Sequence, residues 1–453
     1  MAVLYVFLFI ILYLRMKSFF IVSYLLMVFS FSFFRPGKTY VVEIIRADDL
    51  VLPFLRDGYY LGYGVNIPTV LLATTFVFLL SMLVQNRKLR AYLKEKKEIG
   101  FILLSLFLFI VTGFISSYLY SPFALLSFTW LFQYSAILLV CISTFYMFLL
   151  KKMQLLITVL VTSSLFQFAV VLLQFLKQKG TGIGVEFTTI VSQTFTGLDE
   201  VNTFFRVNGT FMYHNQLALI STLFFAIFFI LFLYSNKKNE ALHLVLTLTN
   251  LIVVILSQTR IMWASIPLVF FLIFVFNRQA LSKLSFIFKK INVKLLLLLF
   301  TLLLAIVIPR VANSLNSTEK GSGIWIRKEM VGEAMLAIQS SPFIGYGIAT
   351  NEFTLFKQFP LGVMSVFPAA VHMAFFQLAL EVGVVGLILF LLPFFIIMRY
   401  FIVNSIKSKY ALIYLCGIVI FTSYYVVHPH VFILESQFLG LLLGIGMIGI
   451  YET

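Results

Sequence analysis

The chain has 453 residues, of which 61% are hydrophobic and only 11% are charged, and its mean hydropathy is +1.05. A soluble domain keeps about a quarter of its residues charged, so this composition excludes a soluble globular protein and predicts an all-α integral membrane protein. The net charge of +16 would suggest nucleic acid binding in a soluble protein, but most of the basic residues lie in short loops between apolar segments, so we expect no nucleic acid partner.

About 12 segments qualify as membrane-spanning helices, since a spanning helix needs about 20 mostly apolar residues. The first apolar run, Ala2–Leu14, is shorter, and a thirteenth span there stays open. The predicted spans are Ser18–Phe34, Asn66–Gln85, Gly100–Tyr120, Ala124–Leu150, Met153–Leu176, Phe211–Tyr234, Ala241–Ser257, Ile261–Asn277, Leu295–Pro309, Val371–Met398, Ala411–Val427 and Val431–Ile450.

Basic residues cluster in loops that fall at every second connection between the predicted spans. The positive-inside rule places these loops in the cytoplasm and the remaining loops outside. We treat residues 1–453 as a single polytopic membrane domain. Its extracytoplasmic loops include 178–210 and the larger 310–370, which connects Leu295–Pro309 to Val371–Met398 and carries helical patterning.

The segment that begins at Arg206 leads from an extracytoplasmic loop into a span. Gly209 permits a turn, and Asn208 or Asn215 can cap a helix end. Capping alone explains these polar residues, so their types do not by themselves indicate a binding site.

Arg260 lies in a link of a few residues between two apolar helices. An arginine near the membrane core costs several kcal/mol unless it is partnered, which makes Arg260 a functional candidate. The alternative is an arginine that extends its head group to the interface from a helix end.

Arg327 lies at the start of a segment that we expect to be helical up to Pro342. It stands on the apolar face of that helix, beside the N-terminus, where an arginine is well placed to bind an anion such as phosphate. The alternative is an interfacial helix whose arginine binds lipid head groups. The predicted apolar face comprises Met330, Val331, Ala334, Met335 and Ile338.

His372 opens the predicted Val371–Met398 helix, and Glu381 lies deeper in it, on the same face as Gln377. A neutral imidazole can accept a proton near pH 7, although a lone histidine at a helix start is more often a structural hydrogen-bonding residue. A buried glutamate must be protonated, paired or hydrogen-bonded, and an interhelical hydrogen bond explains Glu381 more simply than catalysis does.

These segments form an ordered series along the second half of the chain, and the series resembles the bacterial O-antigen ligase and O-antigen polymerase superfamily. The link with Arg260 departs from the family, because it reads Gln-Thr-Arg-Ile where relatives often have Ser-Arg-Gly. The matching motifs are Arg206-x-x-Gly209-x-Phe211, Asn215-Gln-Leu-Ala218, Thr259-Arg260, Arg327, Pro342-Phe-Ile-Gly345-Tyr-Gly347, His372 and Glu381-Val-Gly383-Val-Val-Gly386.

The resemblance implies a GT-C-like glycosyltransferase in the bacterial cytoplasmic (inner) membrane, with its active site on the extracytoplasmic side. The implied donor is a polyprenyl-diphosphate-linked oligosaccharide, and the acceptor is a glycan or another lipid-linked glycan. No cofactor and no metal are expected. The membrane lipid, chain-length regulators and flippase proteins are the further partners that the resemblance implies.

The resemblance also implies roles for individual residues. Arg206, Asn215, Arg260 and Arg327 would bind the donor, and the two last arginines would neutralise charge on the leaving diphosphate. His372 would orient or deprotonate the acceptor hydroxyl. Catalysis is thus expected from His372, Arg327 and Arg260.

Two reactions fit this machinery, and we favour polymerisation of lipid-linked repeat units into an O-antigen, capsule or exopolysaccharide by inverting transfer. The first alternative is an O-antigen ligase, which transfers the glycan to a lipid A core or another terminal acceptor; nothing in the sequence marks a core-saccharide acceptor. The second is a transporter or flippase for lipid-linked oligosaccharides. A transporter should carry ionisable groups near the bilayer midplane and show repeat symmetry, whereas the candidates here gather at one rim.

Overall fold

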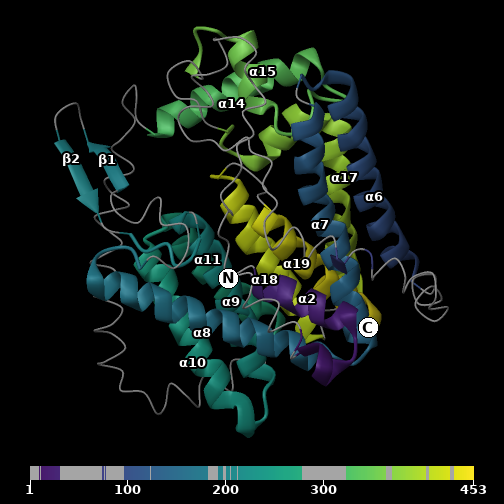
Figure 1. Ribbon diagram of the computed structural model, residues 1–453, viewed down its shortest axis with the longest axis vertical. Coiled ribbons are helices and arrows are strands. Elements are labelled where there is room, and N and C mark those ends of the chain that lie inside the picture. The colour runs from purple at the N-terminus through teal and green to yellow at the C-terminus, as the bar shows by residue number, and fades with distance from the viewer. Residues whose placement is uncertain are drawn as a thin grey trace. The chain divides into compact units, whose positions relative to one another are not determined.

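The computed structural model of the chain is predominantly helical, as the composition predicts (Figure 1). The residues that the structure describes are 10, 12–30, 74–75, 77, 96–122, 124–181, 192–196, 200–204, 206–211, 213–277, 323–363, 370–404, 408–428 and 433–453.

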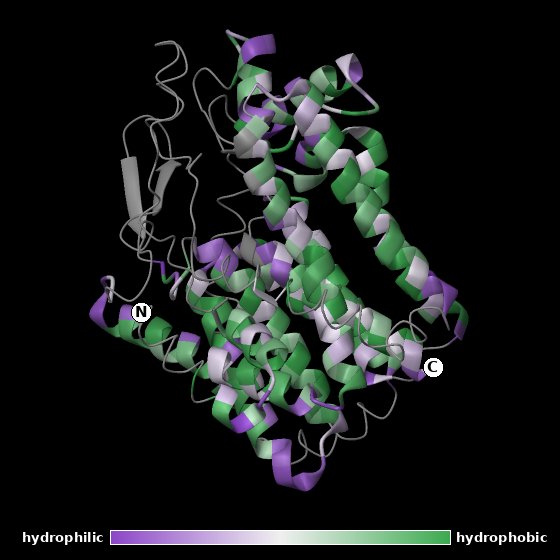
Figure 2. Ribbon diagram, turned by 45° about the vertical axis from the view of Figure 1, so that its right-hand side comes forward, coloured by the Kyte–Doolittle hydropathy of each residue, from purple (hydrophilic) through white to green (hydrophobic). Residues whose placement is uncertain are grey.

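Six helices in this described part are long and apolar enough to cross a membrane. Each coincides with a predicted span, and Figure 2 shows hydrophobic residues along much of the helical surface. The chain is therefore a multi-pass membrane protein. The six helices are α6 (Lys97–Tyr120), α7 (Ala124–Leu149), α8 (Met153–Lys177), α9 (His214–Tyr234), α10 (Lys237–Ser257) and α17 (Ala374–Asn404).

Four other predicted spans coincide with helices outside this set, three of which are apolar but shorter. Leu295–Pro309 lies outside the described residues, and so does nearly all of Asn66–Gln85. The total number of spans therefore stays a prediction. The four helices are α2 (Phe19–Ser30), α11 (Arg260–Phe276), α18 (Lys409–Tyr425) and α19 (Ile433–Glu452).

The chain divides into two compact units, each built from separate stretches of sequence. The first unit comprises Met1–Phe166, Glu329–Ser405 and Tyr425–Thr453. The second comprises Gln167–Lys328 and Ile406–Tyr424.

In the first unit, α6 packs beside α7 and α17, and α19 packs along α7 (Figure 1). Two glycines let α19 approach α7 closely. A Cβ atom at Gly440 would lie 2.5 Å from the carbonyl oxygen of Ile137, and one at Gly444 would lie 2.5 Å from the Cβ of Thr144. Small residues four apart are a common device for close helix packing in membranes.

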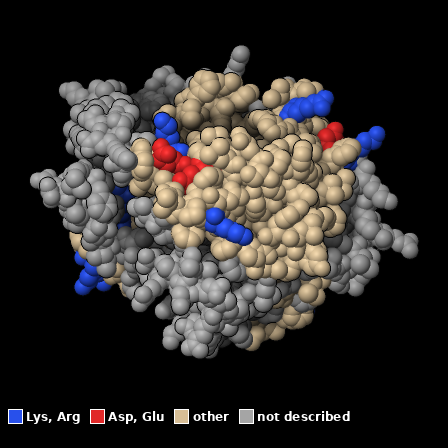
Figure 3. All heavy atoms as spheres, turned by 90° about the horizontal axis from the view of Figure 1, so that it is seen from above, with Lys and Arg blue, Asp and Glu red and all other residues tan. Residues whose placement is uncertain are grey.

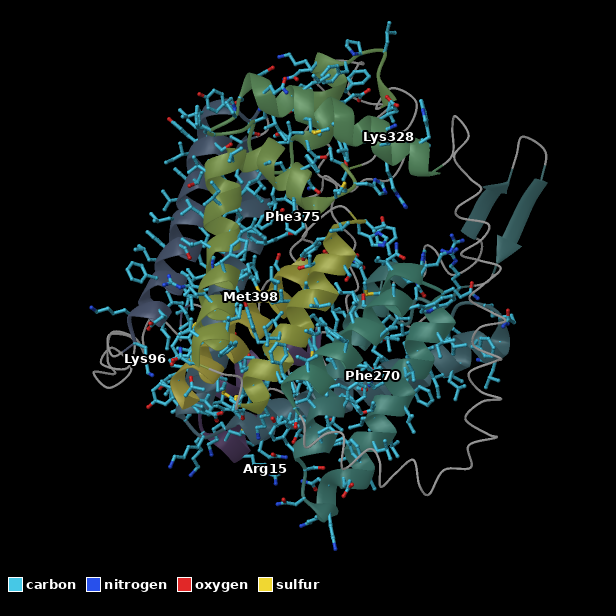
Figure 4. The ribbon with its side chains drawn as sticks, turned by 180° about the vertical axis from the view of Figure 1, so that it is seen from behind. Arg15, Lys96, Phe270, Lys328, Phe375 and Met398 are labelled. Atoms are coloured by element: carbon cyan, nitrogen blue, oxygen red, sulfur yellow. The ribbon has the colours of Figure 1, made fainter. Side chains whose placement is uncertain are left out.

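In the second unit, α9 is the central helix and is buried over nearly all of its length. Helices α10 and α11 pack against it. Phe270 of α11, labelled in Figure 4, meets the rings of Phe225 and Phe229 edge-on at centroid distances of 5.6 and 5.1 Å. A helix that is apolar all round is expected to be enclosed by protein or lipid, and here protein supplies most of the cover.

Residues of the predicted 178–210 loop form a short antiparallel hairpin, which is an addition to the all-α fold that the composition predicts. Strand β1 spans Ser192–Thr196 and β2 spans Glu200–Phe204. The two strands pair so that Ser192 lies opposite Phe204.

The predicted 310–370 loop contains two helices, α14 (Gly323–Ser340) and α15 (Asn351–Gln358). The buried side of α14 differs from the predicted apolar face. Met330 and Ala334 are buried as predicted, but Met335 is 45% exposed. Ala337, outside the predicted face, is buried in its place, because the buried stripe follows a spacing of three to four residues.

Candidate functional site

The turn that carries the Arg206 motif is held by Gln174, a buried residue of α8. Its Oε1 accepts hydrogen bonds from the backbone N–H groups of Asn208 (3.3 Å) and Gly209 (2.9 Å). Its Nε2 donates to the Asn208 side chain (3.1 Å) and to the Gly209 carbonyl oxygen (2.8 Å). One side-chain amide therefore satisfies polar groups that burial would otherwise leave unpaired.

A second glutamine of α8, Gln167, extends this support two helical turns away. Its Oε1 accepts the backbone N–H of Thr210 at 3.2 Å, and its Nε2 contacts the Thr210 hydroxyl. Gly209 has a φ of 59°, and a Cβ there would come within 2.5 Å of Gln167. The expected glycine turn is present, but its position depends on α8, which the motif does not include.

Arg206 contacts His214, the first residue of α9, with 2.9 Å between Nη1 and Nε2. Because a guanidinium only donates, Nε2 must accept, and the proton of the neutral imidazole is on Nδ1. Within the described residues, His214 Nδ1 is buried and has no hydrogen-bond partner. The pair therefore presents an N–H donor beside a cation, which suits an anionic oxygen.

Asn215 connects α9 to the link that carries Arg260. The Thr259 hydroxyl donates to Asn215 Oδ1 at 3.2 Å, and Arg260 is the first residue of α11. The link lacks the family's glycine, yet Gln258 takes the left-handed conformation with φ 56° and ψ 30°. The tight connection between α10 and α11 therefore forms without glycine.

Arg327 lies in the first turns of α14 and is partly buried, as is Arg260. Burial and the positive charge of Arg260 lower the pKa of the Arg327 guanidinium from its usual value, although an arginine stays charged in proteins. In the part of the chain that the structure describes, neither arginine forms an ion pair with a carboxylate. Two neighbouring cations without an acidic partner form an environment that favours a bound anion.

The second unit thus brings together four of the five predicted site residues: Arg206, Asn215, Arg260 and Arg327. His214 joins them through its contact of 2.9 Å with Arg206, and Thr259 joins through its hydrogen bond of 3.2 Å to Asn215. Among the described residues, no group of three or more His, Cys, Asp or Glu could hold a metal ion.

The fifth predicted residue, His372, lies in the first unit, where two motifs interlock around a break in α17. The helix is interrupted at Gly383, which has φ 72° and ψ 174°. The turn from Pro342 to Gly347 fills the break. The N–H groups of Tyr346 and Gly347 donate to the Leu380 and Glu381 carbonyl oxygens (3.0 and 2.8 Å), and the N–H of Val384 donates to Pro342 (2.8 Å). A broken helix in a membrane protein needs such replacement partners.

Three buried serines of α6 and α7 bind the backbone on either side of this interlock, at Glu381 of α17 and at Ile348, which follows the turn. Ser116 donates to the Glu381 carbonyl oxygen (2.7 Å), Ser117 Oγ accepts the N–H of Ile348 (3.1 Å), and Ser127 donates to the Ile348 carbonyl oxygen (2.7 Å). The break is therefore a built feature of the first unit.

His372 precedes α17 instead of opening it, since the helix begins at Ala374, just before Phe375 in Figure 4. Glu381 and Gln377 share a hydrogen bond of 3.1 Å, so the prediction that they lie on one face is confirmed. A second donor, Asn351 of α15, reaches the same carboxyl oxygen at 2.6 Å.

Residues 244–391 match the family model described as O-antigen ligase. This range, about a third of the chain, is similar to the O-antigen ligase family. The match confirms the superfamily that the motifs indicate, and it includes Arg260, Arg327 and His372, whereas Arg206 and Asn215 precede it. Members of the family are membrane glycosyltransferase-like enzymes, ligases or polymerases, that act on lipid-linked glycans. No curated protein matches the chain at significant similarity.

Four residues that support these sites were not predicted from the sequence: Gln167, Gln174, His214 and Asn351. Two glutamines seven residues apart in the otherwise apolar Met153–Leu176 span were a usable signal, because polar side chains in a span usually face a partner. His214 and Asn351 had no comparable signal, since a single polar residue near a helix start is most simply a cap.

Proposed function

We propose that the protein polymerises polyprenyl-diphosphate-linked oligosaccharide repeat units at the outer face of the bacterial cytoplasmic membrane, as a GT-C-like glycosyltransferase. The observation that carries the proposal is two pairs of groups suited to an anion within one unit: Arg206 with the N–H of His214, and Arg260 with Arg327. The similarity of residues 244–391 to the O-antigen ligase family supports a lipid-linked glycan as the substrate. We name Arg206, His214, Asn215, Thr259, Arg260 and Arg327 the anion group.

In the proposed reaction, the acceptor hydroxyl oxygen forms a bond to the anomeric carbon of the donor while the bond from that carbon to the diphosphate oxygen breaks. The polyprenyl diphosphate leaves with the bonding electron pair, so negative charge grows on its oxygens. Arg260 and Arg327 stabilise this charge through charge-assisted hydrogen bonds. Attack opposite the leaving group inverts the anomeric configuration.

His372 is the proposed acceptor of the hydroxyl proton, a role that rests on the family resemblance. A neutral imidazole takes up a proton readily near pH 7. No metal is invoked, because arginines supply the positive charge that the leaving diphosphate requires.

An O-antigen ligase would use the same donor chemistry with a different acceptor. A flippase would move the donor without breaking its diphosphate bond. Few charged side chains appear among the described residues on the face in Figure 3, and the ionisable residues of the anion group lie at or beside the ends of α9, α11 and α14. Their position at helix ends favours chemistry at a membrane rim over transport through the midplane.

The test is to incubate the purified protein with a polyprenyl-diphosphate repeat unit, alone and with a candidate acceptor glycan. A ladder of glycans from the donor alone is expected of a polymerase. A single transfer that requires the second acceptor would identify a ligase and overturn the polymerase proposal.

A further inference from the structure

The backbone around His372 is held on both sides in an unusual conformation. The N–H of Val371 donates to Asn351 Oδ1 at 3.2 Å, and the N–H of Ala374 donates to the His428 carbonyl oxygen at 3.2 Å. Between them, Met373 has a φ of 80°. A non-glycine residue in this region is strained, and such strain persists only where the surrounding structure enforces it. The direction in which His372 leaves the backbone is therefore imposed by its neighbours.

Asn351 is the neighbour that connects this bend to a buried carboxyl group. Its Nδ2 donates to Glu381 Oε1 at 2.6 Å, and Gln377 Nε2 donates to the same oxygen at 3.1 Å. All three side chains are at most 2% exposed. A buried acid and two buried amides cost more than apolar side chains of similar volume would, so packing alone does not account for them.

Glu381 is itself fixed by the interlock at the α17 break. Its carbonyl oxygen accepts from Gly347 at 2.8 Å and from Ser116 at 2.7 Å. Glu381 therefore joins the break, through its backbone, to a series of hydrogen bonds that runs from its carboxyl group through the Asn351 amide to the backbone of Val371, next to His372. Every step lies within the first unit.

We propose that Glu381 and Asn351 are positioning residues that aim the His372 imidazole at the acceptor hydroxyl. The inference rests on the proposed function, because His372 is assigned its role there. The Pro-x-x-Gly-x-Gly turn and the Glu-x-Gly-x-x-Gly stretch then act together, because their hydrogen bonds fix the break in α17 and so the position of Glu381.

The test compares Asn351→Leu, Glu381→Leu, and the exchanged pair Asn351→Asp with Glu381→Gln. In the exchanged pair, the new amide nitrogen at position 381 can donate to the new carboxylate at position 351, and that carboxylate still accepts the Val371 N–H. Gln377 donates to Glu381 Oε1 in the wild type, so its amide must turn over for its oxygen to accept from the same nitrogen. We expect each leucine variant to lower kcat by about 10- to 100-fold, as small misplacements of catalytic groups do. The exchanged pair should recover most of this loss.

Two further readouts separate positioning from a structural role. The pH profile of transfer should change in the leucine variants, because the part of the profile that reports the protonation of His372 shifts when its surroundings change. The KM for the donor should stay unchanged. Thr354→Val is the matched control, since Thr354 is buried in the same helix, α15, and it should keep the wild-type rate and profile.

Leucine variants that fold and keep the wild-type kcat and pH profile would overturn the inference, as would an exchanged pair no more active than the leucine variants. Leucine variants that do not fold leave the decision to the exchanged pair, for which each hydrogen bond has a replacement. Failure of the proposed function is a different result: the wild type would then make no glycan product, or His372→Ala would remain active.

Discussion

At the scale of single residues, the anion group depends on guanidinium chemistry at Arg260 and Arg327. Alanine at either position should lower kcat by about 10²- to 10³-fold, because each removes stabilisation of the charge on the leaving diphosphate. Lysine should restore only part of the rate, since it keeps the charge but loses the planar fork. Rates of glycan transfer by purified variants provide the measurement.

Lys328 is a matched control for Arg327, because it is the next residue of α14 and is exposed (Figure 4). Lys328→Ala should transfer glycan at close to the wild-type rate. An equal loss in Lys328→Ala and Arg327→Ala would mean that general positive charge, and not a bound diphosphate, accounts for the effect.

His214 is expected to contribute through its Nδ1–H group. Phenylalanine removes both ring nitrogens and should weaken donor binding roughly tenfold, the value of about one hydrogen bond to a charged group. Glutamine offers an acceptor for Arg206 and a donor for the ligand, so it should bind the donor more tightly than phenylalanine does. Titration with a polyprenyl diphosphate measures both, and identical affinities for the two variants would contradict the assignment.

Glu352 of α15 predicts a pH dependence of stability. Burial and the nearby Glu381 raise its pKa from about 4.5 to about 7. Between these values the folded protein keeps a proton that the unfolded chain has lost, so stability falls as pH rises from about 4.5 to about 7 and then levels off. Thermal unfolding should show a smaller decline over this range in Glu352→Gln. If stability declines equally in Glu352→Gln and in the wild type, groups other than Glu352 cause the pH dependence.

At the scale of elements, the break in α17 is the feature most sensitive to a single methyl group. A Cβ at Gly383 would overlap the Phe343 carbonyl oxygen, and Gly383 has a φ of 72°. Gly383→Ala should therefore lower the free energy of unfolding by more than about 1 kcal/mol. Gly332→Ala is the control, because a Cβ there would meet no atom within 4 Å, and it should stabilise α14 by up to about 1 kcal/mol.

Melting temperatures of the two glycine variants decide this prediction. If Gly383→Ala unfolds at the same temperature as the wild type, the turn from Pro342 to Gly347 does not fill the break as described.

The helices were largely predictable, whereas their interlocks were not. Hydropathy over about 20 residues located the helices that span Gly100–Tyr120 and Met153–Leu176, because this signal is local. The Gly383 break depends on the turn from Pro342 to Gly347, and the Gln174 contacts depend on the turn at Asn208, each far away along the chain. No periodicity in one segment reports such long-range hydrogen bonds. The interhelical hydrogen bond predicted for Glu381 is confirmed, but its partner, Asn351 of α15, could not be named from the sequence.

The candidate site was likewise predictable in its motif residues but not in its long-range contacts. Motif order predicted Arg206, Asn215, Arg260 and Arg327, and the structure brings these four together in one unit. The neutral state of His214 and the strained bend after His372 follow from three-dimensional contacts. Neither could be predicted from the sequence, because a single polar residue does not report which groups it contacts in the folded protein.

At the scale of the whole molecule, we propose that this multi-pass membrane protein, whose residues 244–391 match the O-antigen ligase family, cleaves its lipid-linked donor and does not move it. This is the distinction between an enzyme and a flippase, which share the donor and the membrane. Polymerase and ligase activity both require that the glycosyl–diphosphate bond breaks.

The most direct test is to place the purified protein in liposomes with a labelled polyprenyl-diphosphate repeat unit and to measure the free polyprenyl diphosphate together with glycan length. We predict that the wild type releases polyprenyl diphosphate in step with the formation of longer glycans, and that Arg327→Ala and His372→Ala release little. An intact donor that crosses to the other leaflet, with no diphosphate released, would contradict the account.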